Sequence, residues 1–162
     1  MSKNKPVVVI GLMGSGKTTV GALVARALGV PLRDSDPFLR ERYGRSAAEI
    51  AAAEGADALH RRESEHVLHA LAERPPPVIA AAASTVEDPE VRAALGGAFV
   101  VWLDAPDTIL AQRMRSSDHR PDFSPAAMRA RRQPFFEQVA DLRLDVSTAT
   151  PEESAKIICD AL

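Results

Sequence analysis

The feature that most constrains this chain is a glycine-rich segment that directly follows a short apolar run near the amino terminus. The segment reads Gly11-Leu12-Met13-Gly14-Ser15-Gly16-Lys17-Thr18, which matches the spacing G-x-x-x-x-G-K-S/T. The apolar run covers residues 7–10, and a helical pattern covers residues 18–28. A buried strand, a glycine-rich turn and a helix in this order are typical of a phosphate-binding loop, or P-loop. We therefore predict a nucleoside triphosphate site, with a glycine-rich turn that carries an accidental lysine as the alternative.

The residue types in this loop suit polyphosphate binding. Glycines let the backbone curl so that successive N–H groups point at phosphate oxygens, at the positive end of the following helix dipole. Lys17 is placed to reach the terminal phosphates, and the Thr18 hydroxyl is placed to bind the Mg²⁺ that bridges them. We predict ATP and Mg²⁺ as ligands, with the nucleotide held by Gly11, Met13, Gly14, Ser15, Gly16, Lys17, Thr18 and Thr19.

Length and composition favour one domain over residues 1–162, because 162 residues with 46% hydrophobic content can fill a single core. A net charge of -2 without a long basic run disfavours a nucleic-acid partner, although Arg129, Arg131 and Arg132 form a small cluster. No apolar stretch approaches the roughly 18–20 residues that cross a bilayer, and no signal-peptide core follows the first residues. We expect a cytoplasmic monomer without a membrane partner, in which the single cysteine, Cys159, is packed rather than reactive.

Apolar runs alternate with helical patterns along the chain, which predicts a three-layer α/β/α fold with a five-stranded parallel sheet of the P-loop NTPase type. The expected strands are residues 7–10, a short strand that ends near Arg33, and residues 78–81, 99–103 and 142–146. Helix starts are indicated by a capping box at residues 46–49, by Ser124-Pro125 and by Thr150-Pro151. The prolines at 75–77 are expected to end the helix that carries Glu63.

Two stretches exceed what a minimal alternation of strands and helices needs. Residues 36–74 have a mostly helical pattern and are interpreted as an inserted helical region that binds the substrate. Residues 115–124 are polar and contain Pro121 and Arg120, which suggests a lid that closes over the nucleotide and excludes water. An ordinary solvated loop is the alternative for this second stretch.

Residues that lie far apart in the chain together resemble the shikimate kinases, within the wider group of nucleoside-monophosphate-kinase-like P-loop kinases. The resemblance runs from residue 7 to about residue 158. It rests on residues 11–18, Asp34-Ser35-Asp36, Glu63, residues 89–95, Arg120-Pro121 and Arg132-Gln133-Pro134. It implies an ATP-dependent kinase that phosphorylates a hydroxyl of a small polar metabolite, shikimate or a related compound.

The resemblance also implies a role for each matching residue. Asp34 would help to hold Mg²⁺ through water near Thr18, and Asp36 would hydrogen-bond the reacting hydroxyl and accept its proton. Lys17, Asp36 and Arg120 would be the catalytic residues, with Arg120 reaching the transferred phosphate from the lid. For Asp36, the alternative is that it only caps the following helix.

Further matching positions would bind the two substrates. Arg132 resembles the arginine that binds the substrate carboxylate, and Glu63 matches the family's glutamate and is predicted to contact the substrate. Arg113 and Pro151 match the positions that sandwich the adenine ring between a guanidinium plane and a proline. For each arginine taken alone, a solvated surface role is the default.

One departure from the family replaces a second carboxylate-binding arginine by His60. A neutral imidazole cannot make the bidentate contact that a guanidinium makes to a carboxylate. Arg61 and Arg62 are adjacent, but they point about 100° and 200° away around a helix and would need a register shift to replace it. A packed or solvated role for His60 is favoured over a ligand role unless a substrate requires it.

A second departure is Ala82-Ala83-Ser84 in place of three glycines, so added Cβ atoms narrow the space beside the substrate. Ser84 could offer a hydroxyl in place of a backbone contact. The predicted substrate contacts are Asp36, His60, Glu63, Ala83, Ser84 and Arg132.

The departures leave the phosphate-binding residues intact, and the leading hypothesis is an ATP-dependent kinase of shikimate-kinase type whose acceptor is a small polar hydroxyl compound, either shikimate or a related one. A genuine shikimate kinase with a compensated pocket is the second hypothesis. The third is a nucleotide-binding protein without transfer activity, against which Lys17, Thr18, Asp34 and Arg120 argue. A mononucleotide kinase is compatible with the fold, although an extra segment for base recognition is not evident.

Overall fold

The structure is a computed structural model that describes residues 5–117 and 124–162, without the side chains at 115–117. Five strands of these residues form one parallel sheet in the order β2-β3-β1-β4-β5. Their bounds are β1 Val7–Ile10, β2 Leu32–Asp34, β3 Val78–Ala80, β4 Phe99–Asp104 and β5 Leu142–Asp145. The predicted three-layer α/β/α fold is confirmed.

Strand β1 lies at the centre of the sheet, between β3 and β4. All four of its residues are buried, and Val8 lies opposite Ile79 of β3 and Val100 of β4. A strand that is apolar at every position must be covered on both faces, which is the usual state of a parallel sheet between helices. The glycine-rich loop therefore leaves the middle of the sheet at the carboxyl end of β1.

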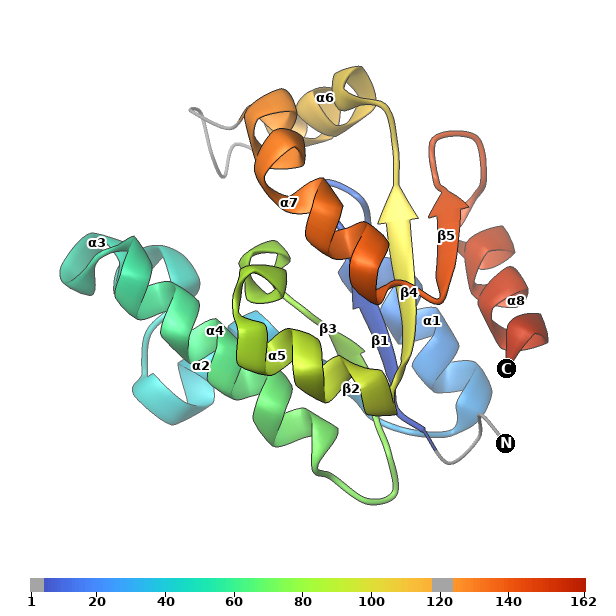
Figure 1. Ribbon diagram of the computed structural model, residues 1–162, viewed down its shortest axis with the longest axis horizontal. Coiled ribbons are helices and arrows are strands. Elements are labelled where there is room, and N and C mark those ends of the chain that lie inside the picture. The colour runs from blue at the N-terminus through green and yellow to red at the C-terminus, as the bar shows by residue number, and fades with distance from the viewer. Residues whose placement is uncertain (1–4, 118–123) are drawn as a thin grey trace.

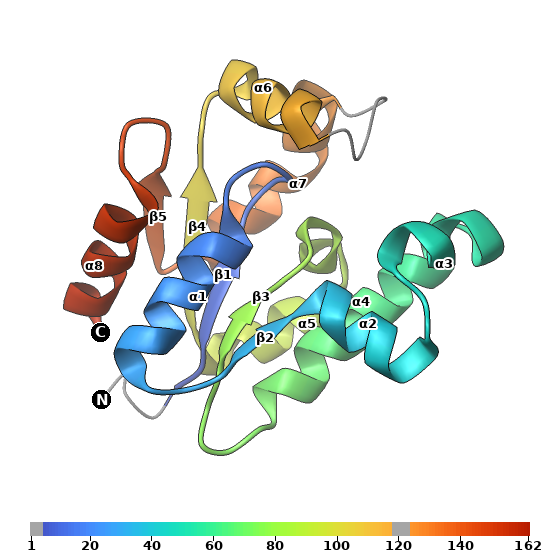
Figure 2. The same cartoon turned by 180° about the vertical axis from the view of Figure 1, so that it is seen from behind.

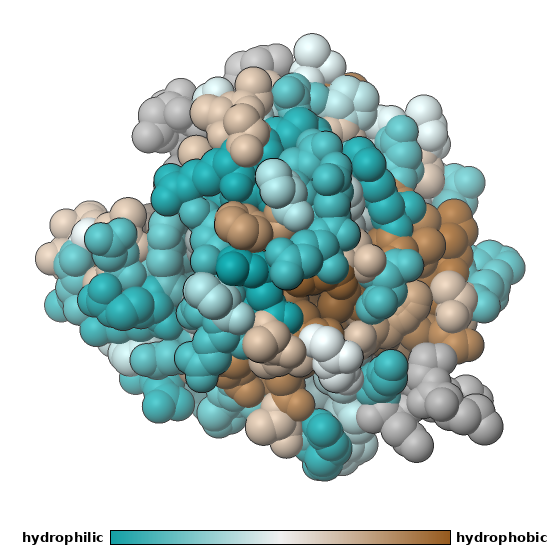
Figure 3. All heavy atoms as spheres, in the orientation of Figure 1, coloured by the Kyte–Doolittle hydropathy of each residue, from teal (hydrophilic) through white to brown (hydrophobic). Residues whose placement is uncertain are grey.

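Helices cover both faces of the sheet (Figures 1 and 2). On one face lie α1 Lys17–Leu28 and α8 Pro151–Ala161, and on the other lie α4 Ala56–Leu71, α5 Pro89–Ala94 and α7 Pro125–Val139. Helix α6, Asp107–Ser117, lies beyond the carboxyl ends of the strands. Hydrophilic side chains predominate over α4 and α7, whereas apolar ones gather toward the edge formed by β5 and α8 (Figure 3).

Local capping chemistry sets several helix starts where the sequence predicts them. Ser46 and Thr150 each form a complete capping box, and Ser124 accepts a hydrogen bond from the Ala127 N–H. The helix with Glu63 ends at Leu71, before the prolines that we expected to end it. Because the chain already leaves the helix there, the prolines lie in the connection to β3 instead.

The alternative that Asp36 caps a helix is wrong, because the cap is Asp34. Helix α2, Ser35–Tyr43, begins directly after β2, and the Asp34 carboxylate accepts a hydrogen bond from the Ser35 N–H at 2.8 Å. Asp36 lies inside the first helical turn. The short spacing between strand end and helix start leaves only Asp34 in the non-helical conformation that a cap needs.

The region 36–74 has a small apolar core of its own. Helices α2 and α3, Ala47–Glu54, pack on the start of α4 through Leu39, Ile50 and Leu59, which are almost fully buried. These helices stand beside the sheet rather than over it (Figures 1 and 2). They are therefore held against the rest of the molecule mainly through α4, which also packs on the main core.

Two smaller expectations concern the single cysteine and membrane-spanning helices. Cys159 is partly buried against the main core, and burial raises the pKa of its thiol, which favours the unreactive form. Within residues 5–117 and 124–162, no helix is long and apolar enough to span a bilayer.

Candidate active site

The glycine-rich loop has a backbone that only glycine adopts easily. Gly11 has φ +150°, and a Cβ at this position would lie 2.5 Å from the carbonyl oxygen of Leu103 in β4. Gly14 and Gly16 also have positive φ values, +88° and +91°. No side chain of the described residues caps α1 at Gly16, so the first N–H groups of this helix remain available to an anion.

The side chain of Lys17 folds back over the loop. Its Nζ donates to the carbonyl oxygens of Gly11 at 2.9 Å and Leu12 at 3.3 Å. Burial lowers the pKa of Lys17 to about 8, and the nearby charge of Asp34 opposes this shift. Arg132 lowers the pKa further, while Glu63 raises it. Charged groups from β2, α4 and α7 therefore surround the lysine of the P-loop.

The Ser15 hydroxyl is a further indication that the loop is built for an anion. Its side chain is 1% exposed, and Oγ has no hydrogen-bond partner in the described part of the chain. A buried hydroxyl without a partner carries a free-energy cost. A phosphate oxygen bound in the loop would supply the missing acceptor.

Thr18 and Asp34 form the part of the site that suits Mg²⁺. The Thr18 hydroxyl donates to Asp34 Oδ2 at 2.8 Å, and the other oxygen of Asp34 is fixed by its capping bond. No cluster of three metal-ligating side chains occurs in the ranges that the structure covers. Mg²⁺ at phosphate sites needs only one or two protein ligands, since water and phosphate oxygens complete its shell. The hydroxyl and the carboxylate therefore fit this ion.

Asp36 is held by two local contacts. Its Oδ1 accepts from the N–H of Ala47, which starts α3, and its Oδ2 accepts from Arg40 Nε at 2.8 Å. The contact with Ala47 ties the first turn of α2 to the start of α3. The role of Asp36 toward an acceptor hydroxyl stays a prediction.

Glu63 and Ser84 meet in the interior on the side of the site opposite α1. The Ser84 hydroxyl donates to Glu63 Oε1 at 2.9 Å, and both side chains are buried. Ser84 and the buried Ala83 lie in η2, Ala83–Glu87, a short 3₁₀ helix after β3. The hydroxyl that we expected to face a substrate is therefore directed to Glu63.

Arg132 lies close to the predicted acceptor side, but it is already paired. Its Nε donates to Glu87 Oε2 at 2.9 Å, and the neighbouring Arg131 donates to Glu87 Oε1 at 2.6 Å. Burial lowers the pKa of His60, the charge of Arg132 adds to this, and Glu87 opposes it. His60, Arg132 and Glu87 therefore form one cluster. The residues near Glu87 in the sequence do not indicate that it pairs with arginines, because its partners lie more than forty positions away.

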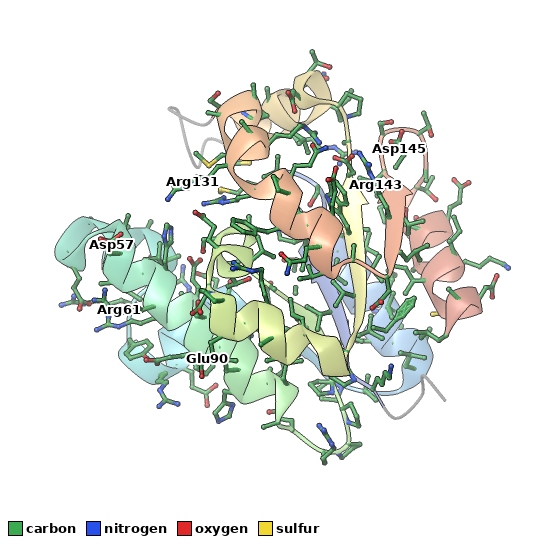
Figure 4. All side chains as sticks on the ribbon, in the orientation of Figure 1. Asp57, Arg61, Glu90, Arg131, Arg143 and Asp145 are labelled. Atoms are coloured by element: carbon green, nitrogen blue, oxygen red, sulfur yellow. The ribbon has the colours of Figure 1, made fainter. Side chains whose placement is uncertain are left out.

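The arginines next to His60 do not replace the missing guanidinium. Arg62 donates to Glu54 and lies over the ring of Tyr43 at 4.4 Å, within the helices of the region 36–74. Arg61 lies on the outer side of α4 (Figure 4). The helical phase that separates these positions by about 100° per residue explains both directions.

A pocket of about 290 Å³ brings Arg113 and Pro151 together beside the P-loop. The Arg113 guanidinium donates to the carbonyl oxygens of Gly14 at 3.0 Å and Val146 at 3.1 Å. The same pocket is lined by Thr19 and Ser154. A fixed guanidinium opposite a proline, next to a phosphate loop, suits a flat ring.

A larger hollow of about 600 Å³ lies at the carboxyl ends of β4 and β5. Its arginines are paired with its aspartates, Arg129 with Asp104 and Asp107, and Arg143 with Asp104. Of the three arginines in the predicted basic cluster, Arg129 therefore pairs with the aspartates of this hollow, whereas Arg131 and Arg132 pair with Glu87. We assign no ligand to this hollow.

The predicted lid falls mostly outside the described residues. Helix α6 continues to Ser117, and α7 begins at Pro125. Arg120 and Pro121 lie in the range 118–123, which the structure does not describe. The catalytic role of Arg120 stays a prediction.

The fold and the site define a P-loop kinase. The family model for shikimate kinase matches residues 13–162. Shikimate kinase of Symbiobacterium thermophilum is 41% identical over 148 residues, which cover 85% of this chain and 84% of that protein. The chain belongs to the shikimate kinase family.

A second relative agrees with this assignment, and a solved structure shares the fold. Shikimate kinase of Mycobacterium tuberculosis is 36% identical over 151 residues, covering 89% of this chain and 85% of that protein. The solved structure of shikimate kinase from Acinetobacter baumannii in complex with shikimate is 24% identical, with a TM-score of 0.89 and coverage of 98% and 93%, and shows the same fold. The chain is an ATP-dependent phosphotransferase with an alcohol acceptor.

Proposed function

We propose that this chain transfers the γ-phosphate of ATP to a hydroxyl of shikimate or a related small polar metabolite, by in-line displacement. The observation that carries the proposal is the set of charges around Lys17, with Asp34 from β2, Glu63 from α4 and Arg132 from α7. Groups predicted for the acceptor thus lie within electrostatic range of the lysine that would contact the terminal phosphate. This juxtaposition is what phosphoryl transfer needs, since positioning and charge neutralisation supply most of the acceleration.

Each described residue has a distinct role in this proposal. The amides of the P-loop and Lys17 hold the phosphates, and Arg113 and Pro151 enclose the adenine ring. Asp36 orients the acceptor hydroxyl and takes its proton as phosphorus–oxygen bond formation proceeds. Thr18 and, through water, Asp34 would hold Mg²⁺, which supplies neutralisation of the phosphate charge. The enzyme is expected to work as a cytoplasmic monomer.

The first test is a coupled assay of ADP release with purified protein, ATP and Mg²⁺. The acceptors are shikimate, related cyclic polyols and nucleoside monophosphates, with a reaction that lacks acceptor as control. We expect release that depends on one of the cyclic hydroxyl compounds. Release without any acceptor would show an NTPase, and no release at all would favour a nucleotide-binding protein that has lost transfer.

The second test separates chemistry from folding. We expect Lys17→Ala and Asp36→Ala to abolish transfer while circular dichroism shows an intact fold. Glu41→Ala, an exposed change in the same helix as Asp36, is the matched control and should keep full activity. Full turnover by Asp36→Ala would remove the proposed role of this carboxylate.

A further inference from the structure

A buried hydrogen bond joins Ser84 to Glu63 between two elements of the acceptor side. The Ser84 hydroxyl on η2 donates to Glu63 Oε1 on α4 at 2.9 Å. The two residues are only 7% and 8% exposed. Water has little access to a carboxylate in such a place, so the charged form depends on the donors that the protein supplies. The hydroxyl of Ser84 is therefore an important partner of Glu63.

Ser84 is carried by a turn that is itself held in place. The Thr85 hydroxyl donates to the carbonyl oxygen of Ala82 at 2.7 Å. Arg92 Nη1 donates to the carbonyl oxygen of Val86, also at 2.7 Å. Ala82 has φ −59° and ψ 145°, which any residue adopts, so this turn tolerates side chains where the family has glycines. The hydroxyl of Ser84 thus reaches Glu63 from a rigid part of the chain.

Glu63 in turn lies within electrostatic range of the phosphate-binding lysine. Burial is the main influence on Lys17 and lowers its pKa, whereas the negative charges of Asp34 and Glu63 raise it. A carboxylate has about four acceptor positions, so a contact with one hydroxyl does not exhaust its capacity toward an acceptor compound. The donors that hold the carboxylate set the directions of the positions that remain.

Position 60 supplies no charged partner for this carboxylate. His60 lies one helical turn before Glu63 on α4, a spacing at which a guanidinium would reach a carboxylate. Burial lowers the pKa of His60, and the charge of Arg132 adds to this, so the imidazole is neutral near neutral pH. The nearby Arg62 donates to Glu54 instead. A neutral donor from η2 therefore holds Glu63 where a charged donor on α4 is missing.

We infer that Ser84 is a positioning residue, which holds Glu63 in the orientation that contacts the acceptor, in place of a charged partner at position 60. The inference rests on the proposed function, because it concerns the acceptor of the same transfer. Ser84 acts through Glu63 rather than on the reacting atoms. Loss of its hydroxyl should therefore weaken the use of the acceptor and leave the nucleotide side unchanged.

The first experiment measures kcat and KM for shikimate and for ATP in the wild-type enzyme and in Ser84→Ala. Where shikimate gives no turnover, the cyclic polyol with the largest ADP release takes its place. We expect Ser84→Ala to raise KM for the acceptor about tenfold, the size expected for one hydrogen bond to a charged group, with kcat within about threefold and KM for ATP unchanged. The control Ser64→Ala removes an equally buried hydroxyl, 7% exposed, from the residue after Glu63 and should change neither KM.

A second comparison shows whether Ser84 acts through Glu63. In Glu63→Gln the neutral amide accepts hydrogen bonds more weakly, so adding Ser84→Ala should change KM for the acceptor by less than about threefold. An equal effect in both backgrounds would overturn the inference, and so would an unchanged KM for the acceptor in a folded Ser84→Ala protein. If Ser84→Ala fails to fold, Ser84→Cys provides the same test, because a thiol keeps the shape of the side chain but is a weak donor.

A pair of crystal structures, of the wild type and of Ser84→Ala, needs no acceptor. The variant should show the Glu63 carboxylate displaced from its wild-type position, whereas an unmoved carboxylate would overturn the inference. If no acceptor supports ADP release, the proposed function fails, and the position of Glu63 in these structures still decides the inference.

Discussion

Lowering the pH from 7.5 to 5 should destabilise the fold through one buried side chain, His66. This histidine lies on α4, is 1% exposed, and packs its ring on Phe38 with 5.1 Å between centroids. Among the described residues, neither ring nitrogen has a hydrogen-bond partner. Burial lowers the pKa of His66 to about 4 from an ordinary value of 6.5.

The groups that face His66 oppose this shift only in part. The carboxylate of Asp34 and, to a smaller extent, that of Glu73 raise the pKa of His66, while His69 lowers it. The desolvation of the ring is the largest of these effects. His66 is therefore neutral in the folded protein at every pH above about 4.

The direction of the effect follows from proton binding in the two states. Between pH 6.5 and about 4 the unfolded chain binds a proton at His66 that the folded protein does not bind, so unfolding becomes easier as the pH falls. With these two pKa values the loss at pH 5 is about 2 kcal/mol. Below about pH 4 both states are protonated at this group, and its contribution does not change further.

Urea unfolding at pH 7.5 and pH 5 measures this loss. His66→Phe keeps an aromatic ring against Phe38 but cannot titrate, so its stability should vary with pH by about 2 kcal/mol less than that of the wild type. The control is His60→Gln. Burial lowers the pKa of His60 as well, but His60 is less buried than His66. If the wild type and His66→Phe lose the same stability at pH 5, the reasoning is refuted.

Two further predictions concern the nucleotide. Since the pKa of Lys17 is about 8 and bound polyphosphate favours the ammonium form, calorimetry should show ATP affinity falling about tenfold between pH 7 and pH 9. Lys17→Met should bind weakly without this dependence, and a wild-type affinity that is constant over the range would contradict the assignment. Arg113→Ala removes the guanidinium from the pocket with Pro151 and should weaken ADP binding up to about tenfold in a fluorescence titration. Arg26→Ala, exposed on α1, serves as its control, and equal affinity of both variants would argue against an adenine site there.

Much of the architecture could be predicted because its signals are local. The strand at residues 7–10 has the predicted bounds, since four consecutive buried apolar residues leave no other place for it in a covered parallel sheet. The capping boxes at Ser46 and Thr150 need only contacts over three residues. The P-loop likewise depends on neighbours in sequence. The end of α4 was less well predicted, because the helix stops before its strongest local breaker.

The candidate site was predicted only in part, because its charges meet across long separations. Resemblance to a family indicated Arg132 and His60, but it gave no reason to consider Glu87. His66 lies on the buried face of α4 that also carries Leu59 and Glu63, at spacings of seven and three residues. That spacing was a usable signal for burial. It could not show that the described surroundings leave the ring without a hydrogen bond.

By itself, the order of residues determined the sheet, the phosphate loop and the helix starts, since each follows from side-chain periodicity or from contacts within one turn. Tertiary structure alone decided which charges neutralise each other. Coulombic pairing depends on distance and burial, and packing of α7 on η2 brings Glu87 to Arg131 and Arg132. The acceptor side of this kinase is therefore a property of the packed helices rather than of any motif.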